Sequence, residues 1–123
     1  MILNIDKQPT GKLAAIDANG SAITYGELCM FAKEVSSYMA PRSLVFMMTE
    51  NTVGGIAWVM GLLESRNVPL ILNSHTEEGL FANMMDIYRP AYICVPSGHL
   101  LVEKHKTLKE AYGYVLLATV QRA

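Results

Sequence analysis

The 123-residue sequence lacks the marks of several specialised protein classes. Only two cysteines occur, Cys29 and Cys94, and both lie in apolar segments without metal-type spacing, which is typical of buried free thiols in a reducing compartment. Ten basic and eleven acidic residues balance, and the densest cationic patch, 104–106, is far short of a nucleic-acid footprint. The N-terminus has no signal-peptide pattern, and the uncharged run 51–63 is too short to span a bilayer. We therefore expect a cytoplasmic protein with no membrane span and no nucleic-acid partner.

The common motifs of catalytic and nucleotide-binding sites are also missing. The sequence has no Gly-x-Gly-x-x-Gly, no Gly-x4-Gly-Lys-Ser/Thr and no Gly-x-Ser-x-Gly. His75, His99 and His105 are scattered, so we predict solvent-facing loop residues rather than metal ligands. Gly54 and Gly55 favour close packing of a helix on a sheet over anion binding. The residues alone therefore predict no catalytic, cofactor-binding or metal-binding side chain.

What the sequence does contain is a central strand–helix–strand unit from 43 to 73. The unbroken apolar run 43–48 predicts a strand that is buried on both faces. A helix follows, for which Asn51 or Thr52 is the expected cap. Its predicted apolar stripe consists of Ile56, Val59, Met60 and Leu63, widened by Ala57, Trp58 and Leu62. A second strand at 68–72 must then lie parallel to the first.

A hairpin and a helix precede this unit. Residues 12–17 and 21–23 read as two strands joined by Asn19-Gly20, which predicts a type I′ turn. Thr24 and Glu27 have the spacing of a capping box, which begins a helix that Pro41 ends.

Shorter elements follow the unit. We predict a third helix at 77–88, capped by Ser74 or Thr76, with one face formed by Leu80, Met84, Ile87 and Tyr88. Strands at 91–95 and 114–120 flank a helical turn at 99–102 and a weak helix at 107–111. The alternation predicts an α/β fold, mostly a parallel sheet with helices on both faces and an N-terminal β-hairpin. Because the chain stops soon after 120, we expect an incomplete sheet whose last strand is unpaired and supports self-association.

Several stretches resemble the adenylate-forming superfamily, which includes acyl-CoA synthetases, peptide-synthetase adenylation domains and luciferase. The stretch 23–28, Ile-Thr-Tyr-Gly-Glu-Leu, resembles the first core motif of that superfamily. The stretch 62–73, Leu-Leu-Glu-Ser-Arg-Asn-Val-Pro-Leu-Ile-Leu-Asn, resembles the second. The strand at 43–48 with Glu50-Asn51, and the strand around 88–95, stand where the family has corresponding strands. The order and spacing agree from about 12 to 97.

The second motif departs from the family pattern. Glu64-Ser65-Arg66-Asn67 replaces the usual Lys-Ala-Gly-Ala, and Ile71-Leu72-Asn73 replaces the usual Pro-Leu-Asp ending. Asn67 is expected to take the place of glycine, because asparagine tolerates a positive φ. The resemblance therefore implies a divergent branch and carries no substrate class with it.

The resemblance implies that residues 1–123 are an N-terminal subdomain fragment of an AMP-forming ligase. The whole enzyme would activate a carboxylic acid with ATP and Mg²⁺ and pass the acyl group to coenzyme A or a carrier-protein phosphopantetheine. The family's ATP loop and catalytic lysine do not occur in this sequence, so the chain is not expected to be active alone, and its first partner would be the rest of its own adenylating domain. The alternative is a stand-alone dimerisation or partner-binding α/β domain. A weaker third hypothesis, a flavodoxin-like nucleotide binder, would need 49–52 as its phosphate loop.

Overall fold

The computed structural model describes residues 5–50, 52–73 and 75–119. Its α-helices are α1 (Tyr25–Tyr38), α2 (Val53–Glu64) and α3 (Glu78–Tyr88), and two 3-10 turns are η1 (Ile5–Lys7) and η2 (Leu100–Glu103). The strands are β1 (Leu13–Ile16), β2 (Ala22–Thr24), β3 (Leu44–Thr49), β4 (Val68–Asn73), β5 (Tyr92–Pro96), β6 (Lys106–Ala111) and β7 (Tyr114–Ala118).

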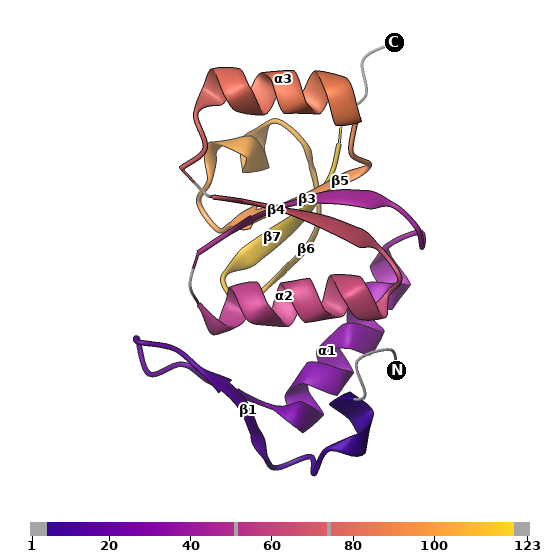
Figure 1. Cartoon of the computed structure of the whole chain (residues 1–123), viewed down its shortest axis with the longest axis vertical. Coiled ribbons are helices and arrows are strands. Elements are labelled where there is room, and N and C mark those ends of the chain that lie inside the picture. Colours follow the sequence, from indigo (N-terminus) through magenta and orange to yellow (C-terminus); the bar gives the residue numbers. More distant parts are fainter. Residues whose placement is uncertain (1–4, 51, 74, 120–123) are drawn as a thin grey trace.

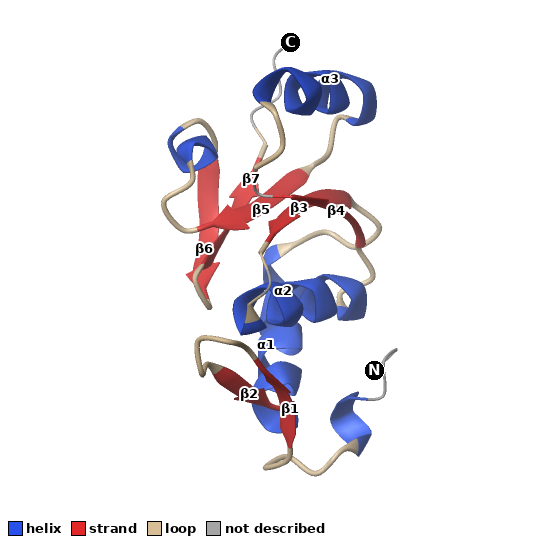
Figure 2. Ribbon diagram, turned by 60° about the vertical axis from the view of Figure 1, so that its left-hand side comes forward, coloured by secondary structure: helices blue, strands red, loops and turns tan. Residues whose placement is uncertain are grey.

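The main sheet has the strand order β4-β3-β5-β7-β6. β4, β3 and β5 are parallel, and β7 is antiparallel to both β5 and β6, so only β7 runs against the common direction. Helices α1 and α2 lie on one face of this sheet, and α3 and η2 lie on the other (Figures 1 and 2). The predicted α/β fold with a mostly parallel sheet and an N-terminal hairpin is confirmed. No helix in the described part of the chain is long and apolar enough to cross a membrane.

The central strand β3 is buried on both faces, as its unbroken apolar run predicts. Val45 and Met47 belong to the core cluster under α1 and α2, whereas Phe46 and Met48 belong to the cluster under α3. The alternation of side chains along a strand produces this division. Phe46 also packs edge-on against Phe81 of α3, with ring centroids 5.9 Å apart.

The capping box of α1 is present as predicted. The Thr24 hydroxyl accepts from the Glu27 N–H at 3.2 Å, and Glu27 Oε1 accepts from the Thr24 N–H at 3.0 Å. The predicted type I′ turn at Asn19-Gly20 is wrong, because Gly20 has a φ of +82° but Asn19 has no positive φ. Asp17 shapes a longer turn instead, since its Oδ1 accepts from the Asn19 and Ser21 amides.

The predicted stripe of α2 is confirmed for Ala57, Trp58 and Leu62, which are fully buried, but the centre of the buried face is rotated away from the other four residues. Thr52 caps the helix by accepting from the Gly55 N–H at 3.2 Å, while Asn51 lies outside the described residues. Ile56 is 46% exposed, and Val59, Met60 and Leu63 are only partly buried. The close packing of α2 on α1 sets which face of α2 is buried, because even a Cβ on Gly61 would lie 3.1 Å from Val35 Cγ2. The residues that face the core are Val53, Gly54, Gly55, Ala57, Trp58, Gly61 and Leu62.

The turn from α2 to β4 also differs from the prediction. Arg66, not Asn67, has the positive φ, at 63°. Asn67 is instead buried at 4% exposure: its Oδ1 accepts from the Ser43 N–H at 3.0 Å and its Nδ2 donates to Ser65 Oγ at 2.7 Å. A side chain inside the fold therefore replaces the small residues that are usual in this motif.

Helix α3 has no side-chain cap at Glu77, so the predicted cap by Thr76 is wrong; Ser74 lies outside the described residues. The Thr76 hydroxyl donates to the Asn73 carbonyl instead. The face toward the sheet is formed by Phe81, Met84 and Met85, whereas the predicted Leu80, Ile87 and Tyr88 are each more than half exposed.

The predicted helix at 107–111 is wrong, because these residues form β6. Tyr112 and Gly113 have φ values of 55° and 79°, and they join β6 to β7 in a two-residue hairpin. Since β7 is paired on both sides, it is not the open edge that we expected, and the edges of the sheet are β4 and β6. The helical turn near 99–102 is confirmed as η2.

Candidate functional site

The carboxyl ends of β3 and β5 form the natural place for a ligand in this fold. The chain runs from β3 through α2 to β4 on one side of β3, and then from β4 through α3, on the opposite face, back past β3 to β5 on the other side. In open α/β sheets, ligands bind at such a switch point. Hollows open on both sides of the sheet there.

The first hollow, which we call the α3 hollow, has a volume of about 570 Å³ and lies between α3 and η2. Its polar lining residues are Thr76, Glu78, His99 and Lys104, and its apolar lining includes Met48, Phe81, Leu100 and Leu101. His99 Nδ1 accepts from the Leu101 N–H at 3.2 Å and so caps η2, and the residue is half-buried rather than fully solvent-facing as predicted. Thr76 and His99 therefore serve the loops around them, and the hollow has the size and mixed lining of a small-molecule site without a paired nucleophile and base.

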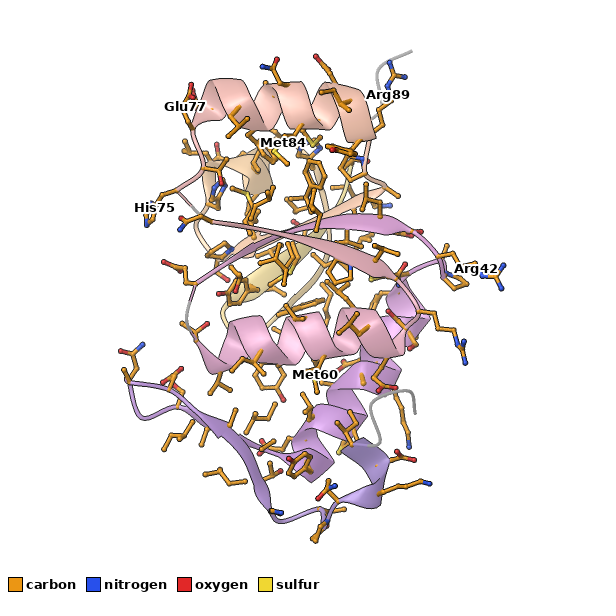
Figure 3. The ribbon with its side chains drawn as sticks, in the orientation of Figure 1. Arg42, Met60, His75, Glu77, Met84 and Arg89 are labelled. Carbon is orange, nitrogen blue, oxygen red and sulfur yellow. The ribbon has the colours of Figure 1, made fainter. Side chains whose placement is uncertain are left out.

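The second hollow, which we call the hairpin hollow, has a volume of about 500 Å³ and lies between the β1–β2 hairpin and α2. Met60 projects from α2 toward the hairpin in Figure 3. Asp17 lines this hollow and accepts from the Val53 N–H through Oδ2 at 2.9 Å. The hydrogen bond from Val53, more than those from Asn19 and Ser21, lowers the pKa of this carboxyl. The chain's own carboxylate thus accepts from an N–H at the start of α2, where the helix dipole favours an anion.

The two glycines at the start of α2 confirm close packing. A Cβ on Gly54 would overlap the Tyr112 carbonyl oxygen, and one on Gly55 would overlap Thr49 Oγ1. The loop after β3 is also held from β7, because the Tyr114 hydroxyl accepts from the Glu50 N–H at 2.9 Å. The described residues of the hypothetical phosphate loop, Thr49, Glu50 and Thr52, are therefore held by packing and hydrogen bonds from β7 and α2.

The other two histidines and the two cysteines lie apart from one another and outside both hollows. His75 is exposed, whereas His105 is half-buried, and burial followed by the charge of Lys104 lowers its pKa. Cys94 is buried and Cys29 is half-buried; both are free thiols, and burial raises the pKa of each. Within residues 5–50, 52–73 and 75–119, no three His, Cys, Asp or Glu side chains converge as metal ligands.

Sequence reasoning missed the residues that organise this edge of the sheet, Asp17 and Tyr114. The sequence places Asp17 where a strand passes into a turn and Tyr114 at the start of a strand, and neither position indicates a contact with α2 or with the loop after β3. Their partners lie 36 and 64 positions away, so no local pattern identifies them.

Searches against protein families and curated proteins find no match to the sequence. Solved structures do match the fold. ATP-bound MatB from Rhodopseudomonas palustris superposes with a TM-score of 0.61 and 21% identity, over 72% of this chain and 19% of that one. The N-terminal subdomain of Klebsiella oxytoca NpsA, in complex with anthranilyl-AMSN, gives 0.63 and 17%, over 73% and 25%. IdnL1 gives 0.68 and 14%, over 97% of this chain and 27% of that one.

These identities establish a shared fold, and the chain spans about a quarter or less of the proteins it matches. The chain has the fold found in the N-terminal portions of adenylate-forming enzymes.

Proposed function

We propose that residues 1–123 are the structural N-terminal portion of an ATP-dependent acid–thiol ligase. The whole protein would convert a carboxylic acid to an acyl-adenylate and then form a thioester on coenzyme A or a carrier protein. ATP and Mg²⁺ would bind outside this portion. The observation that carries the proposal is that residues of both superfamily-like motifs contribute to the fold rather than line a ligand site.

The first motif builds helix α1. Thr24 and Glu27 close its N-terminus, Leu28 is 2% exposed in the core, and Tyr25 packs against the same cluster. A cap of this kind is worth about 1 kcal/mol of stability. The motif therefore has a sufficient structural role without a ligand.

The second motif builds the turn from α2 into β4. Asn67 ties that turn to the start of β3, and Pro69 pairs with Val45 in the parallel ladder. Neither residue lines the α3 hollow or the hairpin hollow. This motif too positions strands, which is the role expected of a scaffold.

The comparisons support the nucleotide chemistry at the level of the related proteins. MatB is described with ATP bound, and the NpsA subdomain with anthranilyl-AMSN. The same chemistry in this protein would require groups that stabilise the negative charge of phosphates. The N-terminus of α2 does not supply such a group, because its Val53 N–H already donates to Asp17. We assign the phosphate-binding groups to polypeptide beyond this chain.

The test compares two proteins. One is the 123-residue chain, and the other is the product of the whole reading frame that contains it. We expect ATP–pyrophosphate exchange with a panel of carboxylic acids only from the longer product, together with a Gly-, Ser- and Thr-rich loop in its sequence. Exchange by the 123-residue chain alone would place the site within these residues and contradict the proposal. A reading frame that encodes no such loop would contradict it as well.

The second candidate is a stand-alone dimerisation or partner-binding domain. The observation that favours it is the apolar edge strand β4, where Val68 is 59% and Ile71 is 55% exposed. A full reading frame that encodes no ATP loop, with a defined oligomer in solution, would support this function over the ligase.

A further inference from the structure

The two edges of the main sheet are built differently. Edge strand β6 carries Lys106, Lys109 and Glu110, and its register with β7 is interrupted between Thr107 and Lys109. Charged side chains and bulges are devices that prevent an edge from pairing with another strand. The β6 edge is therefore protected.

Edge strand β4 has almost none of this protection. All six of its residues pair with β3 in one continuous parallel register, and none of them is charged. Val68 and Ile71 leave more than half of their side-chain surface exposed. β4 is the first strand in the order of the sheet, and among the described residues no helix or strand lies along its outer side in Figures 1 and 2. An apolar and regular edge of this kind is a template for another strand.

The direction of the backbone groups along β4 follows from one hydrogen bond. The Val68 N–H donates to the Ser43 carbonyl at 2.9 Å, so the backbone N–H and C=O of Val68 point toward β3. Because the N–H and C=O groups of successive residues alternate sides, Leu70 and Leu72 also bond to β3. The backbone groups of Pro69, Ile71 and Asn73 therefore face outward.

Two of the possible outward hydrogen bonds cannot be made to a new strand. Pro69 has no N–H to donate. The Asn73 carbonyl already accepts from the Thr76 N–H at 3.0 Å and from the Thr76 hydroxyl. What remains is one carbonyl at Pro69, one N–H at Asn73, and both groups of Ile71.

We propose that β4 pairs antiparallel with β4 of a second copy of this chain, around a two-fold axis at Ile71. In this register the Ile71 N–H donates to the carbonyl of the partner's Ile71, and the reverse bond also forms. The Asn73 N–H donates to the carbonyl of the partner's Pro69, again reciprocally. Pro69, which has no N–H, lies opposite the partner's Asn73, whose carbonyl already accepts hydrogen bonds within its own chain. The pairing therefore leaves none of these outward N–H or C=O groups without a hydrogen bond. Registers centred on Pro69 or Asn73 lack this match.

The charged residues that lie before and after β4 also favour antiparallel pairing of the two copies. Figure 3 shows Arg42 and Arg89 on the right-hand side of the molecule and His75 and Glu77 on the left-hand side. Arg66, just before β4, is exposed, as are Glu77 and Glu78 after it. Antiparallel pairing sets the basic end of one copy beside the acidic end of the other, which is how an isologous contact complements itself.

Side chains on the axis make the interface testable with charges. Ile71 would face its own copy directly, so a lysine or a glutamate there places like charges opposite each other. Since Ile71 is 55% exposed and its backbone bonds face outward, either replacement leaves the core and the β3–β4 ladder intact. Leu13 in β1 is 51% exposed and lies outside the interface, which makes Leu13→Lys the matched control.

The experiment is sedimentation of the purified 123-residue chain over a concentration series, with folding of each variant checked by circular dichroism. We expect the wild-type chain and Leu13→Lys to dimerise alike, and Ile71→Lys and Ile71→Glu each to raise the dissociation constant by about tenfold or more. An equimolar mixture of Ile71→Lys and Ile71→Glu should recover the dimer, because only the mixed pair places opposite charges on the axis.

Three outcomes would overturn the proposal. A wild-type chain that stays monomeric throughout would mean that β4 pairs with other polypeptide or remains free. Dimerisation of Ile71→Lys with wild-type affinity would place the interface elsewhere. Failure of the mixture to recover the dimer would exclude the register centred on Ile71. The inference does not depend on the proposed ligase function, since none of these measurements involves ATP or a carboxylic acid.

Discussion

The carboxylate of Asp17 accepts a hydrogen bond from the backbone N–H of Val53 with an oxygen–nitrogen distance of 2.9 Å. Asp17 lies in the turn of the N-terminal hairpin, and Val53 begins helix α2. The other carboxylate oxygen accepts from the amides of Asn19 and Ser21. One side chain thus shapes the turn and attaches the hairpin to the helix, where the partial positive charge of the N-terminus favours an anion.

We expect Asp17→Ala to lower the melting temperature at neutral pH and to lose this effect in acid. The hydrogen bond from Val53 is the main cause of the lowered pKa of Asp17. A carboxyl with a lowered pKa stabilises the fold above its unfolded pKa of about 3.9, and this stabilisation disappears as the pH falls through the folded value. The difference in melting temperature between wild type and variant should therefore shrink below about pH 4, as measured by circular dichroism from pH 7 to pH 2.

The control for this prediction is Asp86→Ala, which removes an exposed carboxylate from α3. Its effect should be smaller at pH 7. A constant difference between wild type and Asp17→Ala over the whole pH range would show that the charge of Asp17 does not contribute.

Gly54 tests the contact between α2 and the β6–β7 hairpin. Alanine is ordinarily favoured over glycine within a helix by about 1 kcal/mol. Here a Cβ would overlap the carbonyl oxygen of Tyr112, which is backbone and cannot rotate away. We therefore expect Gly54→Ala to lower the free energy of unfolding in urea by about 1–3 kcal/mol.

Gly11→Ala is the matched control, since a Cβ there meets nothing within 4 Å. Its free energy of unfolding should stay within about 0.5 kcal/mol of wild type. If Gly54→Ala were as stable as Gly11→Ala, the hairpin would not be packed on the start of α2.

Local signals in the sequence predicted much of this fold. The Thr24 and Glu27 spacing fixed the start of α1, and the unbroken apolar run of β3 identified a strand buried on both faces. Both signals depend on neighbouring residues alone, since a cap is made within one turn and burial on both faces leaves no polar position. The functional site offered no such signal, because Asp17 and Tyr114 act on residues far away in the sequence.

Edge strand β6 shows why the rest could not be predicted. Its Lys109, Glu110 and Ala111 are good helix formers, and its half-exposed position removes the strong apolar alternation of a strand. The two-residue turn that makes it a hairpin depends on Tyr112, a residue that rarely adopts a positive φ. On α2, the buried face was set by contact between Gly61 and α1, which a hydrophobicity pattern does not contain.

Asn67 carries a prediction about the α2–β4 turn. We expect Asn67→Ala to lower the free energy of unfolding by about 1–3 kcal/mol, because the Ser43 N–H loses its acceptor and Ser65 Oγ loses its donor. Chemical denaturation measures the change. Asn83→Ala, at an exposed position of α3, is the control and should be nearly neutral. Equal effects of the two variants would contradict a structural role for the buried amide.

Trp58 supplies the last prediction, since it joins α2 to the end of β6. The side chain is fully buried, its Nε1–H donates to the Ala111 carbonyl at 2.9 Å, and its ring packs edge-on against Phe31. Trp58→Phe keeps a ring but removes the donor, so we expect a loss of about 1–3 kcal/mol and faster amide hydrogen exchange in the β6–β7 hairpin. Phe46→Leu is the control, because it reduces a buried side chain in the opposite core cluster without removing a hydrogen bond. If the hairpin exchanged no faster in Trp58→Phe than in Phe46→Leu at equal global stability, the indole hydrogen bond would not be what holds the hairpin to α2.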